Sequence, residues 1–202
     1  MVQMNFSDIE QAIIQMASMD TSVEISQGST IEEVVTAIFV DIELHRYQKA
    51  IRFLENYQPK FDGDKELILY AIHTEVQIGL NDFIRAEDYF QLATPLLNGM
   101  NQELRDRYCD WEGLLYQSKA TIELFQGRND MALVYNEKAA ELFNRGKSKL
   151  LLAQNYSSRG LIHSRMGDYT NSLQDFQTSR DLFNMIHYEK YAFLLNSNMA
   201  TI

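Results

Sequence analysis

The chain has 202 residues, with 18 Lys and Arg against 28 Asp and Glu, which gives a formal net charge of −10. This balance lacks the cationic surface that neutralises phosphates, so the composition argues against direct nucleic-acid binding. No apolar run approaches the ~18 residues of a membrane-spanning helix, and the first residues lack the basic and apolar parts of a secretory signal. The single cysteine, Cys109, cannot form an internal disulfide. We therefore expect a protein that does not enter a membrane and that works in a reducing, cytoplasmic setting.

The excess of acidic residues lies at the N-terminus, because residues 1–45 contain eight Asp and Glu and the first basic residue is Arg46. Residues 6–19 have helical apolar spacing, and Ser7 and Glu10 have the spacing of a capping box. Residues 20–29 lack an apolar stripe, so we interpret 1–29 as an acidic N-terminal capping helix and linker. Alternatively, the helix is a mobile arm for a basic partner or a second subunit. As a cap, it would bury Ile9, Ile13 and Ile14.

The rest of the chain is predicted to be a succession of amphipathic helices. Thr30 and Glu33 form a second capping-box pattern, Pro59 and Pro95 limit two of the helices, and Gly146 ends a third. The segment 102–126 is predicted as one unusually long helix. The predicted helices cover about residues 31–44, 47–57, 65–79, 83–97, 102–126, 130–144, 148–166, 169–184 and 188–202.

Small residues recur in phase along this succession. Ala50, Ala86, Ala132 and Ser172 follow one another in steps of 36, 46 and 40 residues. Compact or aromatic residues return seven positions after each of them: Tyr57, Ala93, Ala139 and Ser179. A helix pair that recurs at this spacing indicates a stacked helical solenoid, in which each hairpin buries its apolar face against the next.

The pattern resembles that of the tetratricopeptide repeat (TPR) family. The resemblance rests on the Gly167-x-Tyr169 turn, on an aromatic residue in the first helix, and on a second helix that reads Ala/Ser-x-x-x-Phe-x-x-Ala/Ser. It implies an all-α, right-handed superhelical solenoid of TPR-like hairpins, with about four repeats in residues 30–187. Residues 188–202 would be the first helix of an incomplete further repeat. The first repeat lacks the glycine turn, the third departs from the pattern at Asn129 and Asn136, and the long repeats are similar to divergent bacterial arrays.

The residue types of enzyme sites occur without the partners that their chemistry needs. The chain has four histidines, His45, His73, His163 and His187, and none has a cysteine or carboxylate at metal-ligand spacing. Cys109 follows Tyr108 and precedes Trp111 closely, which is typical of a buried apolar residue. No glycine-rich phosphate loop is present. We therefore expect no enzyme activity, no catalytic residue, no metal and no cofactor.

In the TPR family the first helices line a concave surface that takes an extended peptide or a partner helix. The resemblance therefore implies a groove lined by Glu75, Gln117, Thr121, Gln154, Ser157, Ser158, Leu161 and Arg165. Only Arg165 among them is basic, so tight recognition of an acidic peptide C-terminus is not expected. A solvated polar face with no ligand is the alternative interpretation of these residues.

The function predicted from this groove is that of a scaffold for protein–protein or peptide interaction. Its partner would be a protein or peptide, without nucleic acid or membrane, and a homodimer is compatible with the pattern. One alternative is the N-terminal regulatory or sensor region of a larger bacterial signalling protein, whose output domain lies beyond residue 202. A weaker alternative is an enzyme with an unrecognised site.

Overall fold

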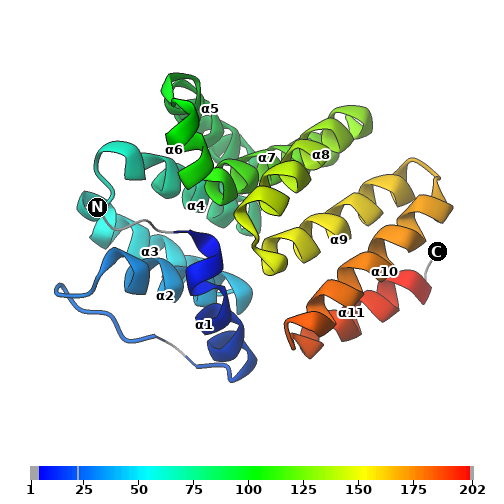
Figure 1. Cartoon of the computed structure of the whole chain (residues 1–202), viewed down its shortest axis with the longest axis horizontal. Coiled ribbons are helices and arrows are strands. Elements are labelled where there is room, and N and C mark those ends of the chain that lie inside the picture. The colour runs from blue at the N-terminus through cyan, green and yellow to red at the C-terminus, as the bar shows by residue number, and fades with distance from the viewer. Residues whose placement is uncertain (1–4, 22, 201–202) are drawn as a thin grey trace.

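A computed structural model describes residues 5–21 and 23–200, and throughout these residues the fold is all-α (Figure 1). Two short 3₁₀ turns, Gln58–Lys60 and Gly63–Lys65, lie between α3 and α4. None of the helices described has the combined length and apolarity that crossing a membrane requires. The α-helices are α1 (Phe6–Ser18), α2 (Ile31–Glu43), α3 (Tyr47–Tyr57), α4 (Glu66–Gly79), α5 (Phe83–Gly99), α6 (Gln102–Arg107), α7 (Cys109–Phe125), α8 (Asn129–Gly146), α9 (Lys149–Arg165), α10 (Tyr169–Met185) and α11 (Glu189–Ala200).

Helices that follow one another in the chain pack side by side. The closest pairs are α4 with α5, α7 with α8, and α9 with α10, while α2 packs on α3 and α10 on α11. The pairs are joined because α4 also packs on α7, and α9 packs on both α7 and α8. One apolar core runs through these contacts, and its largest fully buried side chains include Phe6, Trp111, Phe143, Phe176 and Phe183.

The in-phase small residues occupy equivalent buried positions. The side chains of Ala50, Ala86, Ala132 and Ser172 have an exposed fraction of 0%. Seven residues further on, Ala93, Ala139 and Ser179 are likewise fully buried, whereas Tyr57 is half-buried. Each of these residues lies on the second helix of a pair, where a large side chain would hold the two helices apart.

A left-handed residue precedes each small residue by five positions. His45, Asn81, Gly127 and Gly167 have φ angles of 56°, 60°, 77° and 79°. Around each of them, three backbone hydrogen bonds close the preceding helix in the same order, as in a Schellman motif. The predicted helix limits place all four turns, but the sequence marks the left-handed conformation only where glycine is present. Histidine and asparagine adopt the same conformation in the first two pairs, since both residue types tolerate the left-handed region better than most.

Two predicted helix boundaries are wrong. The predicted helix 102–126 is two helices, α6 and α7, which meet at Tyr108 with φ −107° and ψ 19°. There the Tyr108 hydroxyl donates to Asp64 Oδ2 at 3.0 Å, and Arg105 donates to the carbonyl of Leu97 at 2.6 Å. These contacts tie α6 to the chain before α4 and to the end of α5, so the helix changes direction. Pro95 lies inside α5, which continues to Gly99 with the proline ring exposed.

One of the two predicted capping boxes is confirmed. The Thr30 side chain accepts from the Glu33 N–H at 3.2 Å, and the Glu33 carboxylate accepts from the Thr30 N–H at 2.8 Å. The prediction for Ser7 and Glu10 is wrong, because α1 begins at Phe6 and its N-cap residue is Asn5. The Glu10 carboxylate does not turn back on its own helix. It accepts a hydrogen bond from Ser148 at the start of α9.

Candidate binding face

The eight residues predicted to line a groove lie on three helices that contact one another in series, α4, α7 and α9. Glu75 is on α4, Gln117 and Thr121 are on α7, and the other five are on α9. We call this set of eight residues the candidate binding face. The structure joins some of them to other parts of the protein and leaves others accessible, so the set does not behave as one uniform surface.

Glu75 is enclosed between α4 and α7. Its carboxylate accepts a hydrogen bond from the hydroxyl of Ser118. Burial raises the pKa of Glu75 to about 7, and the nearby carboxylate of Glu43 raises it further, while the Ser118 hydrogen bond opposes the shift. A carboxylate that is hard to ionise at neutral pH is better suited to helix packing than to holding a ligand at the surface.

Glu43, at the end of α2, forms hydrogen bonds with residues far along the chain. Its carboxylate accepts from Gln154 Nε2 on α9 at 2.7 Å and from the hydroxyl of Tyr188 at 3.1 Å. Burial raises the pKa of Glu43, and hydrogen bonds from these residues and from Tyr191 oppose that rise. No local pattern in the sequence pointed to Glu43, Tyr188 or Tyr191 as part of the site. The only signal in the sequence is a carboxylate at the end of an otherwise apolar helix, and its partners are 111 and 145 residues away.

Arg165, the one basic residue predicted for the groove, turns toward the end of α7. Its Nη1 donates to the carbonyl of Leu124 at 3.0 Å, and its guanidinium lies over the Phe125 ring at 5.6 Å. The Leu124 carbonyl also accepts from the Gly127 N–H at 3.1 Å, so the guanidinium adds a second hydrogen bond at the end of α7. The guanidinium therefore links α9 to α7.

The accessible part of the candidate binding face lies on α7 and α9. On α7, Thr121 is half-buried and donates to the carbonyl of Gln117 at 3.2 Å. On α9, Ser157 and Ser158 are half-buried, Leu161 is 45% exposed, and Arg165 is exposed. Gln117 itself is buried, and its Oε1 has no hydrogen-bond partner among the residues described. The face therefore combines accessible hydroxyl groups, one apolar side chain and one guanidinium with a buried, unpaired acceptor.

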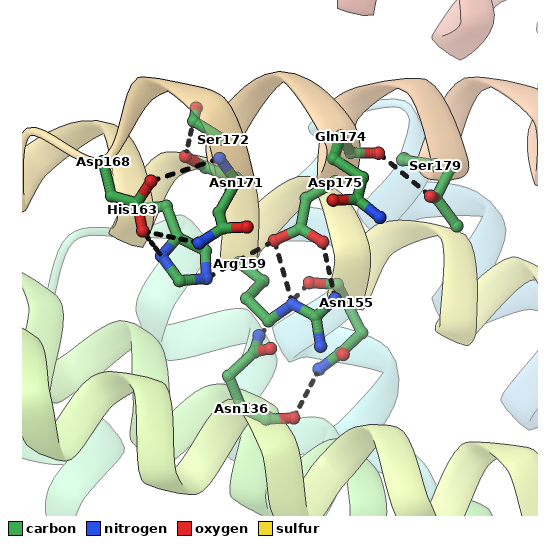
Figure 2. Close-up of polar contacts among 12 residues, drawn as sticks. Asn136, Asn155, Arg159, His163, Asp168, Asn171, Ser172, Gln174, Asp175 and Ser179 are labelled. Atoms are coloured by element: carbon green, nitrogen blue, oxygen red, sulfur yellow. Dashed lines mark hydrogen bonds and ion pairs between the residues drawn. The ribbon is translucent and has the colours of Figure 1, made fainter.

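The other side of α9 is fixed by polar contacts, which Figure 2 shows. Arg159 donates to both carboxylate oxygens of Asp175 on α10, at 2.9 and 2.5 Å. On the α8 side, the side-chain amides of Asn136 and Asn155 each donate to the other residue's backbone carbonyl at 3.2 Å. These contacts hold α9 between its neighbours, so the orientation of its accessible side chains is set by the fold (Figure 2).

The N-terminal ends of α7 and α9 are covered by α1, which lies in the space framed by α2, α7 and α9 (Figure 1). The Phe6 ring contacts the rings of Phe39 on α2 and Trp111 on α7, with centroid distances of 4.8 and 5.6 Å. Ser148, the N-cap residue of α9, donates to Glu10 at 2.6 Å. Ile9, Ile13 and Ile14 are buried in this contact.

His73 and Cys109, whose residue types occur in enzyme sites, lie in the packed interior of the protein. His73 is buried and stacks on the ring of Tyr89 at 4.3 Å, and burial lowers its pKa to about 4. Burial raises the pKa of the Cys109 thiol, which makes the nucleophilic thiolate scarce. Residues 5–21 and 23–200 hold no group of three or more His, Cys, Asp or Glu side chains that could bind a metal ion.

No protein-family model matches the chain, and no curated protein matches it with significant similarity.

Proposed function

We propose that the chain is a divergent TPR-type array, a right-handed solenoid of helix hairpins that binds a protein or peptide partner. Its architecture is supported by the left-handed turn that recurs at His45, Asn81, Gly127 and Gly167. Each turn is followed five residues later by a fully buried small residue. The left-handed turn alone is a common helix ending, and it also occurs at Asp20 and His187. The support lies in its constant distance from a fully buried small residue at four junctions, because stacked copies of one hairpin require that spacing.

The binding surface in this proposal is the accessible part of the candidate binding face, on α7 and α9. The observation that carries it is the unpaired Oε1 of Gln117, a buried acceptor on the same face as the half-buried hydroxyls of Thr121, Ser157 and Ser158 and the exposed Leu161. A buried acceptor without a donor is costly, and a ligand N–H would remove that cost when the Gln117 side chain turns outward to meet it. A peptide backbone supplies such donors, while an apolar side chain of the ligand would contact Leu161.

Selection from a random peptide library displayed on phage, using the intact chain as bait, tests the proposal. Selected peptides would then be titrated against Gln117→Ala and Leu161→Asp variants by fluorescence anisotropy. We expect each substitution to weaken binding at least about tenfold, because it removes a buried acceptor or places a charge in the contact. Leu92→Asp is the matched control, since Leu92 is 52% exposed on α5 and outside the candidate face. The proposal fails if both face variants bind as the control does.

A further inference from the structure

The place where α1 lies has the properties of a helix-binding site. The Phe6 and Ile13 side chains of α1 are fully buried against the helices that follow in the chain. The Phe6 ring meets Phe39 and Trp111 edge to face, a favourable arrangement for aromatic pairs. We call Phe39, Asp110, Trp111 and Ser148 the α1 docking site. It takes residues from three helices, α2, α7 and the N-terminal end of α9.

The polar contacts of α1 are less favourable than its apolar ones. Glu10 accepts from Ser148 and faces the backbone N–H groups at the start of α9, which stabilise its charge. It also lies close to the buried carboxylate of Asp110, and burial with this like charge raises the pKa of Asp110 to about 7. The backbone N–H groups of Phe6 and Ser7 are near Asp110, but neither is in hydrogen-bonding geometry with it. The proximity of Glu10 and Asp110 therefore makes the position of α1 less stable than its apolar contacts alone would.

The connection between α1 and α2 would let α1 leave without unfolding the other helices. About a dozen residues separate Ser18 from Ile31, enough to span about 40 Å when extended. Its described apolar contact is that of Ile25, which is half-buried against the core. Asp20 pairs with Arg46 at 2.7 Å, with the Asp20 side chain 76% exposed, and Lys60 donates to the carbonyls of Gln27 and Ser29 at 3.3 and 2.5 Å. Exposed ion pairs of this kind contribute little stability.

We propose that the α1 docking site binds an amphipathic helix of a partner protein, which enters by displacing α1. The partner helix would repeat the apolar spacing of Phe6, Ile9, Ile13 and Ile14, since these side chains show what the site accommodates. It would carry a neutral acceptor such as Gln in place of Glu10, because that change removes the like charge opposite Asp110 and keeps an acceptor for Ser148 and the start of α9. This proposal rests on the proposed function in one respect, because the proposed function makes the partner a protein. The α1 docking site and the candidate binding face share no residue.

A labelled peptide with the sequence of residues 5–19 and the change Glu10→Gln is the probe. It would be titrated by anisotropy against the full-length wild type and against full-length Ile13→Asp, which weakens the hold on the chain's own α1. Ile84→Asp is the matched control, because Ile84 is 79% exposed on α5. The wild type keeps its own α1 at a high effective concentration. We therefore expect Ile13→Asp to bind the probe at least about tenfold more tightly than the wild type and Ile84→Asp do.

Trp111 gives a second, independent measurement, since it is the only tryptophan of the chain and is fully buried beside Phe6. Its emission should shift to the red in Ile13→Asp and return toward the wild-type wavelength when the unlabelled probe is added. If Ile13→Asp does not unfold cooperatively, Phe6→Ala serves as the second variant. Equal probe affinity for the wild type and a folded α1 variant would overturn the proposal. Peptides that depend on Leu161 would still bind in that case, so this failure and that of the proposed function are distinguishable.

Discussion

The ring of Phe176 fills the space beside Gly160, so closely that a Cβ at Gly160 would lie 2.9 Å from the ring. In the middle of α9 an alanine would otherwise favour the helix by about 1 kcal/mol over glycine. Here the added methyl group must move a fully buried ring that the surrounding core holds in place. We therefore expect Gly160→Ala to lower the free energy of unfolding by about 1–3 kcal/mol, as measured by chemical denaturation.

Gly99→Ala is the control for this substitution, because a Cβ at Gly99, the last residue of α5, would meet no atom within 4 Å. It should leave the free energy of unfolding nearly unchanged. If both alanine variants are as stable as the wild type, Phe176 does not require the small residue, and the close approach of α9 and α10 has another cause.

The left-handed turns predict opposite effects for opposite substitutions. Asn81 adopts φ 60° with an exposed side chain, so Asn81→Gly should raise the melting temperature by relieving a conformation that glycine adopts freely. Gly167, with φ 79°, occupies the equivalent turn, and Gly167→Ala should lower stability by about 1 kcal/mol. Thermal unfolding followed by circular dichroism measures both changes. A destabilised Asn81→Gly variant would show that the asparagine side chain contributes more than its backbone strain costs.

These turns also show how far the sequence could predict the fold. The phase of the small residues identifies where helices must approach closely, since that requirement acts on side-chain size and is visible in the sequence. The left-handed conformation acts on the backbone, so it is visible in the sequence only where glycine is present. The sequence places the turn at His45 between two predicted helices, but it does not indicate the left-handed φ. The break at Tyr108 was missed for a different reason. It depends on contacts of Arg105 and Tyr108 with distant segments, and no local pattern records these.

The candidate site was predictable to the extent that it follows from helix phase. The register identified polar residues on α4, α7 and α9, and these helices do contact one another in series. It did not indicate that the carboxylate of Glu43 would bind Gln154, or that α1 would cover the start of α7 and α9. Both arrangements bring together segments more than 100 residues apart. Helical periodicity carries no information on such contacts.

The buried carboxylates predict how stability changes with pH. Burial raises the pKa of Asp110 from 3.8 to about 7 and that of Glu75 from 4.5 to about 7. Between the unfolded and folded pKa values the folded protein binds more protons than the unfolded chain. Stability should therefore be greatest near the unfolded values, fall as pH rises toward about 7, and level off above it. Melting temperatures measured from pH 5 to pH 8 in one ionic strength would show this decline.

Asp110→Asn should flatten the decline, because the amide does not ionise. At pH 8 we expect it to raise the free energy of unfolding by on the order of 1–3 kcal/mol, with little change at pH 5. Asp88→Asn, an exposed substitution on α5, provides the control and should follow the wild-type profile. A wild-type protein that becomes more stable as the pH rises from 5 to 8 would contradict the assignment of these two groups as the dominant titrating sites.

The side-chain amides of Asn136 on α8 and Asn155 on α9 are paired, and the positions in register with Asn136 on α5 and α10 hold Phe90 and Phe176. Both asparagines are fully or almost fully buried, at 0% and 1% exposure. Each amide donates an additional hydrogen bond to a carbonyl within the other helix, so removing one amide loses a buried hydrogen bond between α8 and α9. Asn136→Ala and Asn155→Ala should each destabilise the protein by about 0.5–1.5 kcal/mol.

The two substitutions should not be additive, since the amides act across one shared contact. In a double-mutant cycle measured by denaturant unfolding, we expect a coupling energy of about 0.5–3 kcal/mol between them. Asn136→Ala combined with Thr178→Ala, an exposed hydroxyl group on α10 that bonds only within its own helix, provides the reference pair and should be additive. Additive behaviour of the asparagine pair would show that each amide stabilises its own helix alone, and that the α8–α9 contact depends on apolar packing.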